Sequence, residues 1–416
     1  MNTTRRLALH SLGLGGLAVL SGPAALLAAG NGKKLPVAAV VTTYFENSHA
    51  DVIVGKILEG WRQKSGTGPD LELVSLYTDQ VDSNDLSRGL SKKHGFRLAK
   101  TIDEAVTLGQ NRLPVAGVLS IGEHGNYPKN KIQQRKYPRR RFFDEIITAM
   151  RRCGEFVPLF NDKHLSWNWS DAKHMYDVAA CHRIPFMAGS SLPVTWRYPA
   201  KELPVGSEIE EAMVLGYGGL ESYGFHSVEA LQCIVERRRG GETGVTAITA
   251  VTGDQIWQAE KEGKWSRQLL VSAMATFDGS ADKLEDRLSR TNAAFYLIEY
   301  RDGLRATVAM LNGVSAEKAV ACRLRGQAEP FSCWFRLEEQ KPFGHFEHLL
   351  RAIQHMFHTK HPAYPVQRTL LTTGILDRVM NSLNQKGKRL FSPELAISYK
   401  PSRWGFANLS EENFPS

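Results

Sequence analysis

Three ionisable residues stand directly after a short apolar run. The segment at 157–169, "VPLFNDKHLSWNW", contains Asp162, Lys163 and His164. Parallel α/β proteins place their ligand sites at the carboxyl ends of buried strands. A lysine at such a place can act as a general acid or base. The alternative is an ion pair between Asp162 and Lys163 that only holds the loop, and local sequence leaves both interpretations open.

A histidine that follows a glycine-rich approach is the second candidate. The segment at 216–236, "GYGGLESYGFHSVEALQCIVE", contains His226, with Glu229 on the same helical face. Histidine exchanges protons near neutral pH, and a carboxylate at this spacing could hold one tautomer of its ring. The alternative is a histidine that is hydrogen-bonded within the core.

Short apolar runs alternate with amphipathic segments in the first half of the chain. The runs lie at 37–41, 71–77, 115–122, 156–160 and 184–189. They are rich in Val, Leu and Ile, which is typical of strands buried on both faces. The alternation predicts a Rossmann-like α/β domain, with a parallel sheet and right-handed crossovers.

The pattern changes near residue 197. The segment at 293–313 contains two strand-like runs joined by "RDG", which predicts a hairpin with Gly303 at its turn. Further strand-like runs and two late helices follow. The second half therefore predicts an α+β domain with an open, mainly antiparallel sheet. The expected parts are an export signal at 1–30, a Rossmann-like domain at 35–196, an α+β substrate and oligomerisation domain at 197–400, and a tail at 401–416.

These segments, in this order, resemble the glucose–fructose oxidoreductase/inositol dehydrogenase/MocA family. Asp162 and Lys163 match the first two positions of its acidic–Lys–Pro motif, with His164 in place of the proline. The second motif of the family ends in Asp-x-Gly-x-His, and Ser222 stands at its aspartate position. The remaining matches to that motif are Gly218, Gly219, Gly224 and His226, followed by Glu229.

The resemblance implies an active site between two domains and a nicotinamide cofactor, NAD or NADP. Lys163 or His226 would take a hydroxyl proton from a sugar or polyol, and a hydride would leave for the nicotinamide. The implied catalytic residues are Lys163, His226 and Asp162. The implied cofactor-binding residues are Thr43, Asn47, Asp79, Glu123 and His124. The implied substrate-binding residues are Trp196, Arg197 and Glu221.

One departure from the family pattern divides the functional hypotheses. The loop at 42–49, "TTYFENSH", holds no glycine, although a phosphate-binding loop needs glycine for close backbone approach. The first hypothesis is a sugar or polyol oxidoreductase. The second is a relative without a dinucleotide, either a carbohydrate-binding protein or a cofactor-free sugar-processing enzyme.

A metal site is a third hypothesis, based on histidine spacing in the late helices. The residues concerned are His345, His348, His355, His358 and His361. Histidines three residues apart can meet on a helix, but such pairs are unspecific and no other ligand type accompanies them. We therefore assign no metal ligands.

The charge balance is basic but does not predict a nucleic-acid-binding protein. The 416 residues carry a formal net charge of +9, with a basic cluster at 133–143, "QQRKYPRRRFF". No recognisable nucleic-acid-binding module accompanies it, so we interpret the cluster as a solvated surface. The five cysteines are scattered, which predicts buried thiols and not a disulfide framework.

The first thirty residues predict an export signal. Arg5 and Arg6 precede an apolar run that ends in small residues, as in signals read by the twin-arginine export machinery. That machinery exports folded proteins, so the expected location is the periplasm or another exported compartment.

Overall fold

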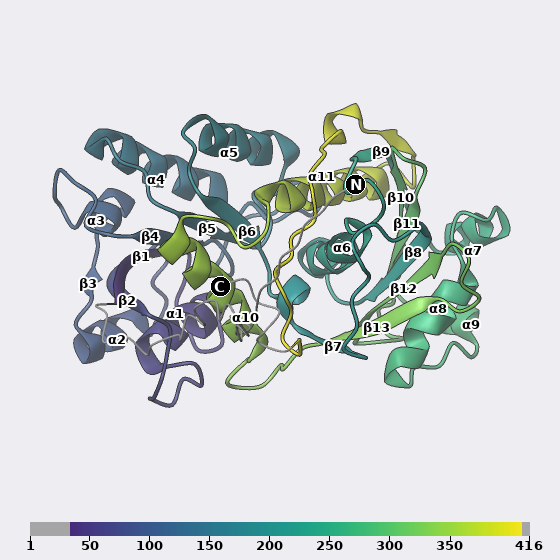
Figure 1. Ribbon diagram of the computed structural model, residues 1–416, viewed down its shortest axis with the longest axis horizontal. Coiled ribbons are helices and arrows are strands. Elements are labelled where there is room, and N and C mark those ends of the chain that lie inside the picture. The colour runs from purple at the N-terminus through teal and green to yellow at the C-terminus, as the bar shows by residue number, and fades with distance from the viewer. Residues whose placement is uncertain (1–33, 410–416) are drawn as a thin grey trace, which may run out of the picture. The chain divides into compact units, whose positions relative to one another are not determined.

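The computed structural model describes residues 34–409 (Figure 1). The export signal expected at 1–30 therefore lies outside the described residues. Between residues 34 and 409, no helix has the length and apolar character needed to cross a membrane.

The first sheet is parallel and has the strand order β3-β2-β1-β4-β5-β6. Its order reverses between β1 and β4, which makes this the switch point where dinucleotide-binding sheets open their crevice. The strands are β1 (Leu35–Val41), β2 (Leu71–Thr78), β3 (Arg97–Leu98), β4 (Gly117–Ile121), β5 (Leu159–Asp162) and β6 (Phe186–Gly189).

Helices cover both faces of this sheet because its strands are apolar on both sides. In β1, Ala38 and Val40 pack under α3, α4 and α5, whereas Val37, Ala39 and Val41 face α1. The helices are α1 (His49–Glu59), α2 (Ser87–His94), α3 (Ile102–Thr107), α4 (Arg139–Cys153) and α5 (Trp169–Cys181).

The second sheet is mixed and has the strand order β14-β9-β10-β11-β8-β12-β13-β7. Among its described pairings, β8 and β11 run parallel and the others antiparallel. The hairpin predicted around Gly303 is β10 and β11. The strands are β7 (Trp196–Tyr198), β8 (Ile209–Gly216), β9 (Val245–Thr252), β10 (Ala294–Tyr300), β11 (Arg305–Met310), β12 (Lys318–Leu324), β13 (Phe331–Arg336) and β14 (Leu390–Phe391).

Two helix layers cover the second sheet. Val214 of β8 packs under α6 and α11, and its neighbour Met213 faces α7, α8 and α9. The helices are α6 (Ser222–Val235), α7 (Asp254–Lys261), α8 (Arg267–Met274), α9 (Leu284–Leu288) and α11 (Val366–Asn384). Together the two sheets confirm the predicted fold class, a Rossmann-like α/β part and an α+β part with a mainly antiparallel sheet.

The late helix α10 (His345–Thr359) returns to the first sheet. Leu349, Ile353 and Phe357 belong to the apolar cluster of β1 and α1. The ring of Phe357 lies directly over Gly117 in β4, where a Cβ atom would come within 2.7 Å of ring carbons. Only glycine at this point of β4 lets α10 approach the sheet so closely.

The described cysteines are all free thiols. Cys233, Cys322 and Cys333 are buried as expected, but Cys181 is exposed at the end of α5. The expectation of buried thiols is thus met for three positions. Cys153 is only half-buried, and the expectation is wrong for Cys181, because that position faces outward on its helix.

The contact between Gly117 and Phe357 predicts a steric cost. Gly117→Ala should lower the free energy of unfolding by about 1–3 kcal/mol, because the added methyl overpacks the contact. In a Phe357→Leu background the same change should cost less, since the smaller side chain leaves room. Urea unfolding measures both.

As a control, Gly89→Ala in α2, where a Cβ meets nothing within 4 Å, should stabilise by about 0.5–1 kcal/mol. Equal costs of Gly117→Ala in both backgrounds would contradict the contact.

Candidate active site

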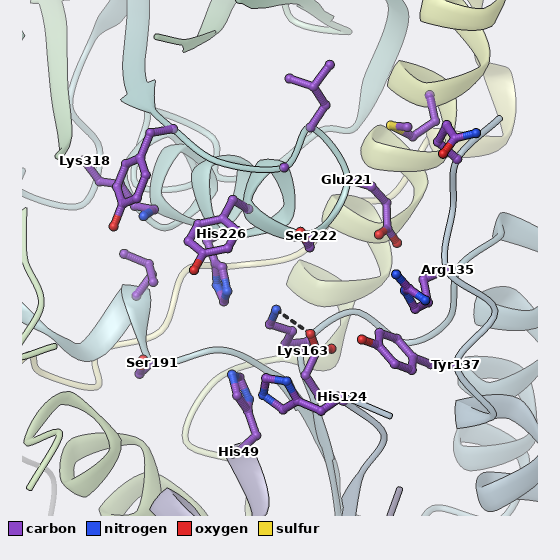
Figure 2. Close-up of a pocket in the computed structure, with 18 of the residues that line it drawn as sticks. His49, His124, Arg135, Tyr137, Lys163, Ser191, Glu221, Ser222, His226 and Lys318 are labelled. Atoms are coloured by element: carbon purple, nitrogen blue, oxygen red, sulfur yellow. Dashed lines mark hydrogen bonds and ion pairs between the residues drawn. The ribbon is translucent and has the colours of Figure 1, made fainter. Parts of the chain in front are cut away.

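A cavity of about 970 Å³ is lined by residues that follow the strands of the first sheet and by residues of the second sheet and the helices around it. This volume lies within the range of small-molecule sites. Lys163 follows β5 of the first sheet, while His226 comes from α6 and Lys318 from β12 of the second part. Figure 2 shows His226 pointing from its helix towards Lys163. The structure thus brings together the two residues that the sequence singles out for proton transfer.

Glu123, directly after β4, is the buried centre of the first-sheet side. Its carboxylate accepts hydrogen bonds from Lys163 Nζ at 2.9 Å and from Arg139 Nη2 at 2.5 Å. Burial alone would raise the pKa of Glu123, but the charges of Lys163 and Arg139 hold it well below its usual range. Glu123 is therefore ionised, and Lys163 pairs with it and not with Asp162.

Three predicted site residues adopt left-handed backbone conformations. The φ angles are 65° at Asn47, 68° at His124 and 63° at Lys163. Such conformations cost non-glycine residues on the order of 1–3 kcal/mol each and gather at functional sites. At Lys163 a bond from its N–H to the Gly189 carbonyl, at 3.0 Å, holds the turn. This turn directs the side chain into the cavity.

A hydrogen-bond relay orients His226. The His226 Nδ1 atom lies 2.9 Å from Ser190 Oγ, and the Ser190 hydroxyl donates to Glu229. When Glu229 is ionised, the single hydroxyl proton of Ser190 is committed to it, so Nδ1 carries the ring proton and Nε2 keeps its lone pair. Glu229 thus holds the tautomer through Ser190, whereas the sequence predicts direct contact.

The surroundings of His226 keep it neutral. Burial lowers its pKa well below the ordinary value, and the positive charges of Lys163 and Lys318 lower it further. Burial also raises the pKa of Glu229 to about 7, against the hydrogen bonds from Ser190 that favour its charged form. The relay therefore ends in a carboxyl group that changes charge near neutral pH.

His164, which stands at the family's proline position, is buried beside the cavity. Its Nε2 atom accepts a hydrogen bond from Arg139 Nη1 at 2.9 Å and lies 3.3 Å from Glu221 Oε1. Burial and the nearby Arg139 charge lower the pKa of His164. Glu221 itself lines the cavity on the same side as Arg135 (Figure 2).

Asp162 is fully buried and bonds to the first residue of α1. The Asp162 Oδ2 atom lies 2.7 Å from His49 Nδ1, and the His49 ring packs edge-on against Phe346 at 5.1 Å. Asp162 therefore lies behind the cavity lining, where it holds His49. The loop ion pair between Asp162 and Lys163, the alternative left open above, does not form.

Two predicted substrate-binding residues do not reach the cavity. Arg197 is 2% exposed, and its guanidinium donates to Glu202 at 2.8 Å and stacks on the Phe406 ring at 4.2 Å. Trp196 packs edge-on against His348 at 5.2 Å. Both residues lie in β7, at the edge of the second sheet, which sets them away from the cavity.

Basic residues missed by the sequence interpretation do reach the cavity. Lys129, Lys131 and Arg135 line it, and Arg139 is buried against Glu123. The interpretation of the 133–143 cluster as a solvated surface is therefore wrong in part. Residues 122–138 join β4 to α4, whereas such connections usually have only about 2–6 residues. The unusual length of this connection was the signal in the sequence that it has a role beyond joining β4 to α4.

The same connection bridges the crevice at the switch point. It crosses β1 to reach the end of β2, where Asn126 and Gln80 exchange hydrogen bonds of 2.8 and 3.1 Å. Tyr127 donates to Asp79 Oδ2 at 2.6 Å, and Arg141 and Tyr77 bond the other oxygen. Asp79, which the resemblance implies as a cofactor-binding residue, is thus engaged by side chains of its own chain.

Backbone N–H groups of the loop between β1 and α1 donate hydrogen bonds to side chains of the same segment. The N–H of Asn47 donates to Asp51 Oδ2 at 2.8 Å, and Ser48 Oγ accepts from Phe45 and Asp51. Asp51 is buried, so a carboxyl group stands where a pyrophosphate would need positive charge. Predicted Thr43 is buried in the same loop, outside the cavity lining. These residues do not fit a bound dinucleotide in the described conformation.

Comparison with known proteins shows the fold. No protein-family model matches the chain, and neither does any curated protein. Solved structures do match, among them a probable dehydrogenase from Thermotoga maritima at 11% identity, which covers 87% of this chain and 100% of that one with a TM-score of 0.55.

Inositol dehydrogenases are also similar. The scyllo-inositol dehydrogenase of Lactobacillus casei, solved with NAD(H) and scyllo-inositol, is 12% identical over 86% of this chain and 99% of that one, with a TM-score of 0.53. The myo-inositol 2-dehydrogenase of Lactobacillus plantarum is 12% identical over 86% of this chain and 99% of that one, with a TM-score of 0.52. The chain therefore has the fold of polyol dehydrogenases of the type that its sequence resembles.

Metal binding receives no support from the described residues. Within 34–409, no group of three or more His, Cys, Asp or Glu side chains is arranged to hold a metal ion. His345 lines the cavity, and burial lowers its pKa to about 3, while His348 packs against Trp196.

The raised pKa of Glu229 predicts a pH-dependent stability difference. A carboxyl group with a raised folded-state pKa stabilises the fold below its unfolded pKa and loses this contribution as pH rises through the folded value. Relative to Glu229→Gln, the wild type should lose about 3 kcal/mol as pH rises from about 4.5 through about 7. Denaturant unfolding of both proteins at several pH values measures this difference. A constant difference across this range would contradict the buried, raised-pKa carboxyl group.

Proposed function

We propose that this protein performs acid–base chemistry on a carbohydrate or polyol in the cavity, without a bound dinucleotide. The supporting observation is that Lys163 and His226 face the same cavity while chain segments bridge the crevice at the switch point. The prediction of NAD or NADP as cofactor comes from the sequence resemblance and is supported by the fold, whereas the contacts of the residues at 42–51 and 122–128 argue against it.

Lys163 and His226 have complementary charge states, because Lys163 is positively charged and His226 is neutral. His226 is neutral with Nε2 available, so it can accept a proton from a substrate hydroxyl or from a carbon beside a carbonyl group. The Lys163 ammonium, held by Glu123, stabilises the negative charge that develops on the substrate oxygen. Return of the proton to the adjacent carbon, with transfer of a hydroxyl proton between the two oxygens, completes an isomerisation. Return of a proton to the same carbon from the opposite face completes an epimerisation, and in neither case do electrons leave the substrate.

A second candidate is a nicotinamide-dependent sugar or polyol dehydrogenase. The observation that favours it is the fold, because the similar scyllo-inositol dehydrogenase holds NAD(H). Binding at the corresponding place would require the 122–128 segment to release Gln80 and Asp79.

Two measurements on the purified protein separate the candidates. Titration calorimetry with NAD⁺, NADH and NADP⁺ up to about 1 mM should show no saturable binding. Reducing sugars and keto sugars incubated with the protein in D₂O should gain deuterium at a carbon beside the carbonyl group, as followed by NMR. Lys163→Met and His226→Gln should each slow this exchange by about 10²–10⁴-fold.

Matched controls are available on the surface. Lys92→Met in α2 and His358→Gln in α10 remove exposed side chains of the same types and should leave exchange unchanged. Saturable dinucleotide binding, with sugar-dependent reduction of the cofactor, would replace the proposal with the second candidate. Exchange that survives both Lys163→Met and His226→Gln would contradict the assigned roles.

We also propose export by the twin-arginine machinery, supported by Arg5, Arg6 and the following apolar run. The double change Arg5→Lys and Arg6→Lys keeps the charge but alters the paired arginines. It should leave the protein in the cytoplasm, whereas the unchanged chain should appear in the exported fraction. Cell fractionation and immunoblotting measure this. Equal export of both chains would contradict the twin-arginine route.

A further inference from the structure

Lys318, the first residue of β12, is a buried cation without a carboxylate partner. Its side chain is 2% exposed and lines the cavity, and its Nζ atom lies 3.8 Å from the centre of the Tyr217 ring and 5.4 Å from that of Tyr223. Among the described residues, no carboxylate oxygen forms an ion pair with it. Burying an unpaired ammonium is costly, and aromatic faces compensate only part of that cost.

The nearest acidic groups are engaged elsewhere. Glu339 accepts a hydrogen bond from the Tyr217 hydroxyl at 2.8 Å, and Glu317 accepts one from Trp334 Nε1 at 2.8 Å. Both stay too far from Lys318 to pair with it. The ammonium therefore remains free for a ligand in the cavity.

The lining as a whole has an excess of positive charge. Its acidic residues are Glu123, Glu221 and Glu339, and Glu123 is already neutralised by Lys163 and Arg139. Its basic residues are Lys129, Lys131, Arg135, Lys163 and Lys318. A cavity with this excess attracts anions and raises their local concentration.

We propose that the cavity selects carbohydrates that carry a carboxylate, and that Lys318 binds this carboxylate. The inference rests on the proposed function in taking the ligand to be a carbohydrate. One compact ammonium matches one singly charged group. Phosphate recognition favours several donors or a free guanidinium fork, but Arg135 donates to the Tyr127 carbonyl and Arg139 to Glu123.

The position of Lys318 suits this role. Lys318 comes from the second sheet, whereas Lys163 comes from the first, and both lower the pKa of His226 between them. A sugar acid held at Lys318 by its carboxylate would direct its hydroxyl-bearing carbons towards Lys163 and His226. The anionic group would thus orient the substrate for proton transfer.

Titration calorimetry on the purified protein tests the proposal with four probes: glucuronate, gluconate, glucose and glucose 6-phosphate. At least one sugar acid should bind about tenfold or more tightly than glucose. Lys318→Met should weaken sugar-acid binding by about 10–100-fold and change glucose binding by less than about twofold. Lys92→Met, which removes an exposed lysine, should change neither.

The wild type supplies a test that needs no variant. Burial lowers the pKa of Lys318 to about 8, with Lys163 acting in the same direction and Glu339 and Glu317 opposing it. Sugar-acid affinity should therefore fall as pH rises above about 8, while glucose affinity stays flat. The titrations at high pH remain informative if the Lys318→Met protein fails to fold.

Several outcomes would overturn the proposal. Equal binding of glucose and the sugar acids, independent of Lys318, would remove the anion preference and leave the acid–base proposal intact. Tighter, Lys318-dependent binding of glucose 6-phosphate would replace the carboxylate by a phosphate. Failure of every carbohydrate to bind would contradict both.

Discussion

The buried carboxylate of Glu123, at the end of β4, stays ionised only because two cations accompany it. The positions of several cavity residues depend on these two ion pairs. Glu123 draws Lys163 into a left-handed turn after β5 and holds Arg139 at the first turn of α4. Removing one partner of such a buried group leaves an uncompensated charge, which typically costs about 3–5 kcal/mol. The ends of β4, β5 and α4 are thus fixed relative to one another. Lys163 therefore enters the cavity in one defined orientation.

The second consequence concerns the crevice at the switch point. In this fold the crevice can receive a dinucleotide when loop N–H groups and a strand-end carboxylate are free to bind it. Here Ser48 and Asp51 take the loop donors, and Tyr127 and Arg141 take the Asp79 carboxylate. Each of these contacts satisfies a polar group that a cofactor would otherwise satisfy. These contacts support the proposal that no dinucleotide binds at this crevice.

The sequence predicts the parts of this architecture that depend on local pattern. Buried strands, the hairpin at Gly303 and the placement of Lys163 after β5 follow from hydrophobic period and turn chemistry. The roles of Arg197 and Lys318 could not be predicted from the sequence, because these roles depend on which strands become neighbours in the second sheet. Both residues lie in strands with ordinary hydrophobic patterns, yet Arg197 stacks on Phe406 and Lys318 lines the cavity. The length of the connection at 122–138 is a signal of an unusual segment, but neither its length nor its charge shows that it folds back over a crevice.

Electrostatics then connects the two sides of the cavity. His226 lies between the positive charges of Lys163 and Lys318, which together with burial lower its pKa. An anionic group seated on Lys318 would cancel one of these charges. The pKa of His226 would then rise, with burial still lowering it, so its affinity for a proton would increase when the ligand binds. A neutral sugar in the same place would leave the Lys318 charge uncompensated, and the pKa of His226 would stay low. Under the proposal, binding of the charged group and proton transfer at His226 would therefore be coupled through Lys318.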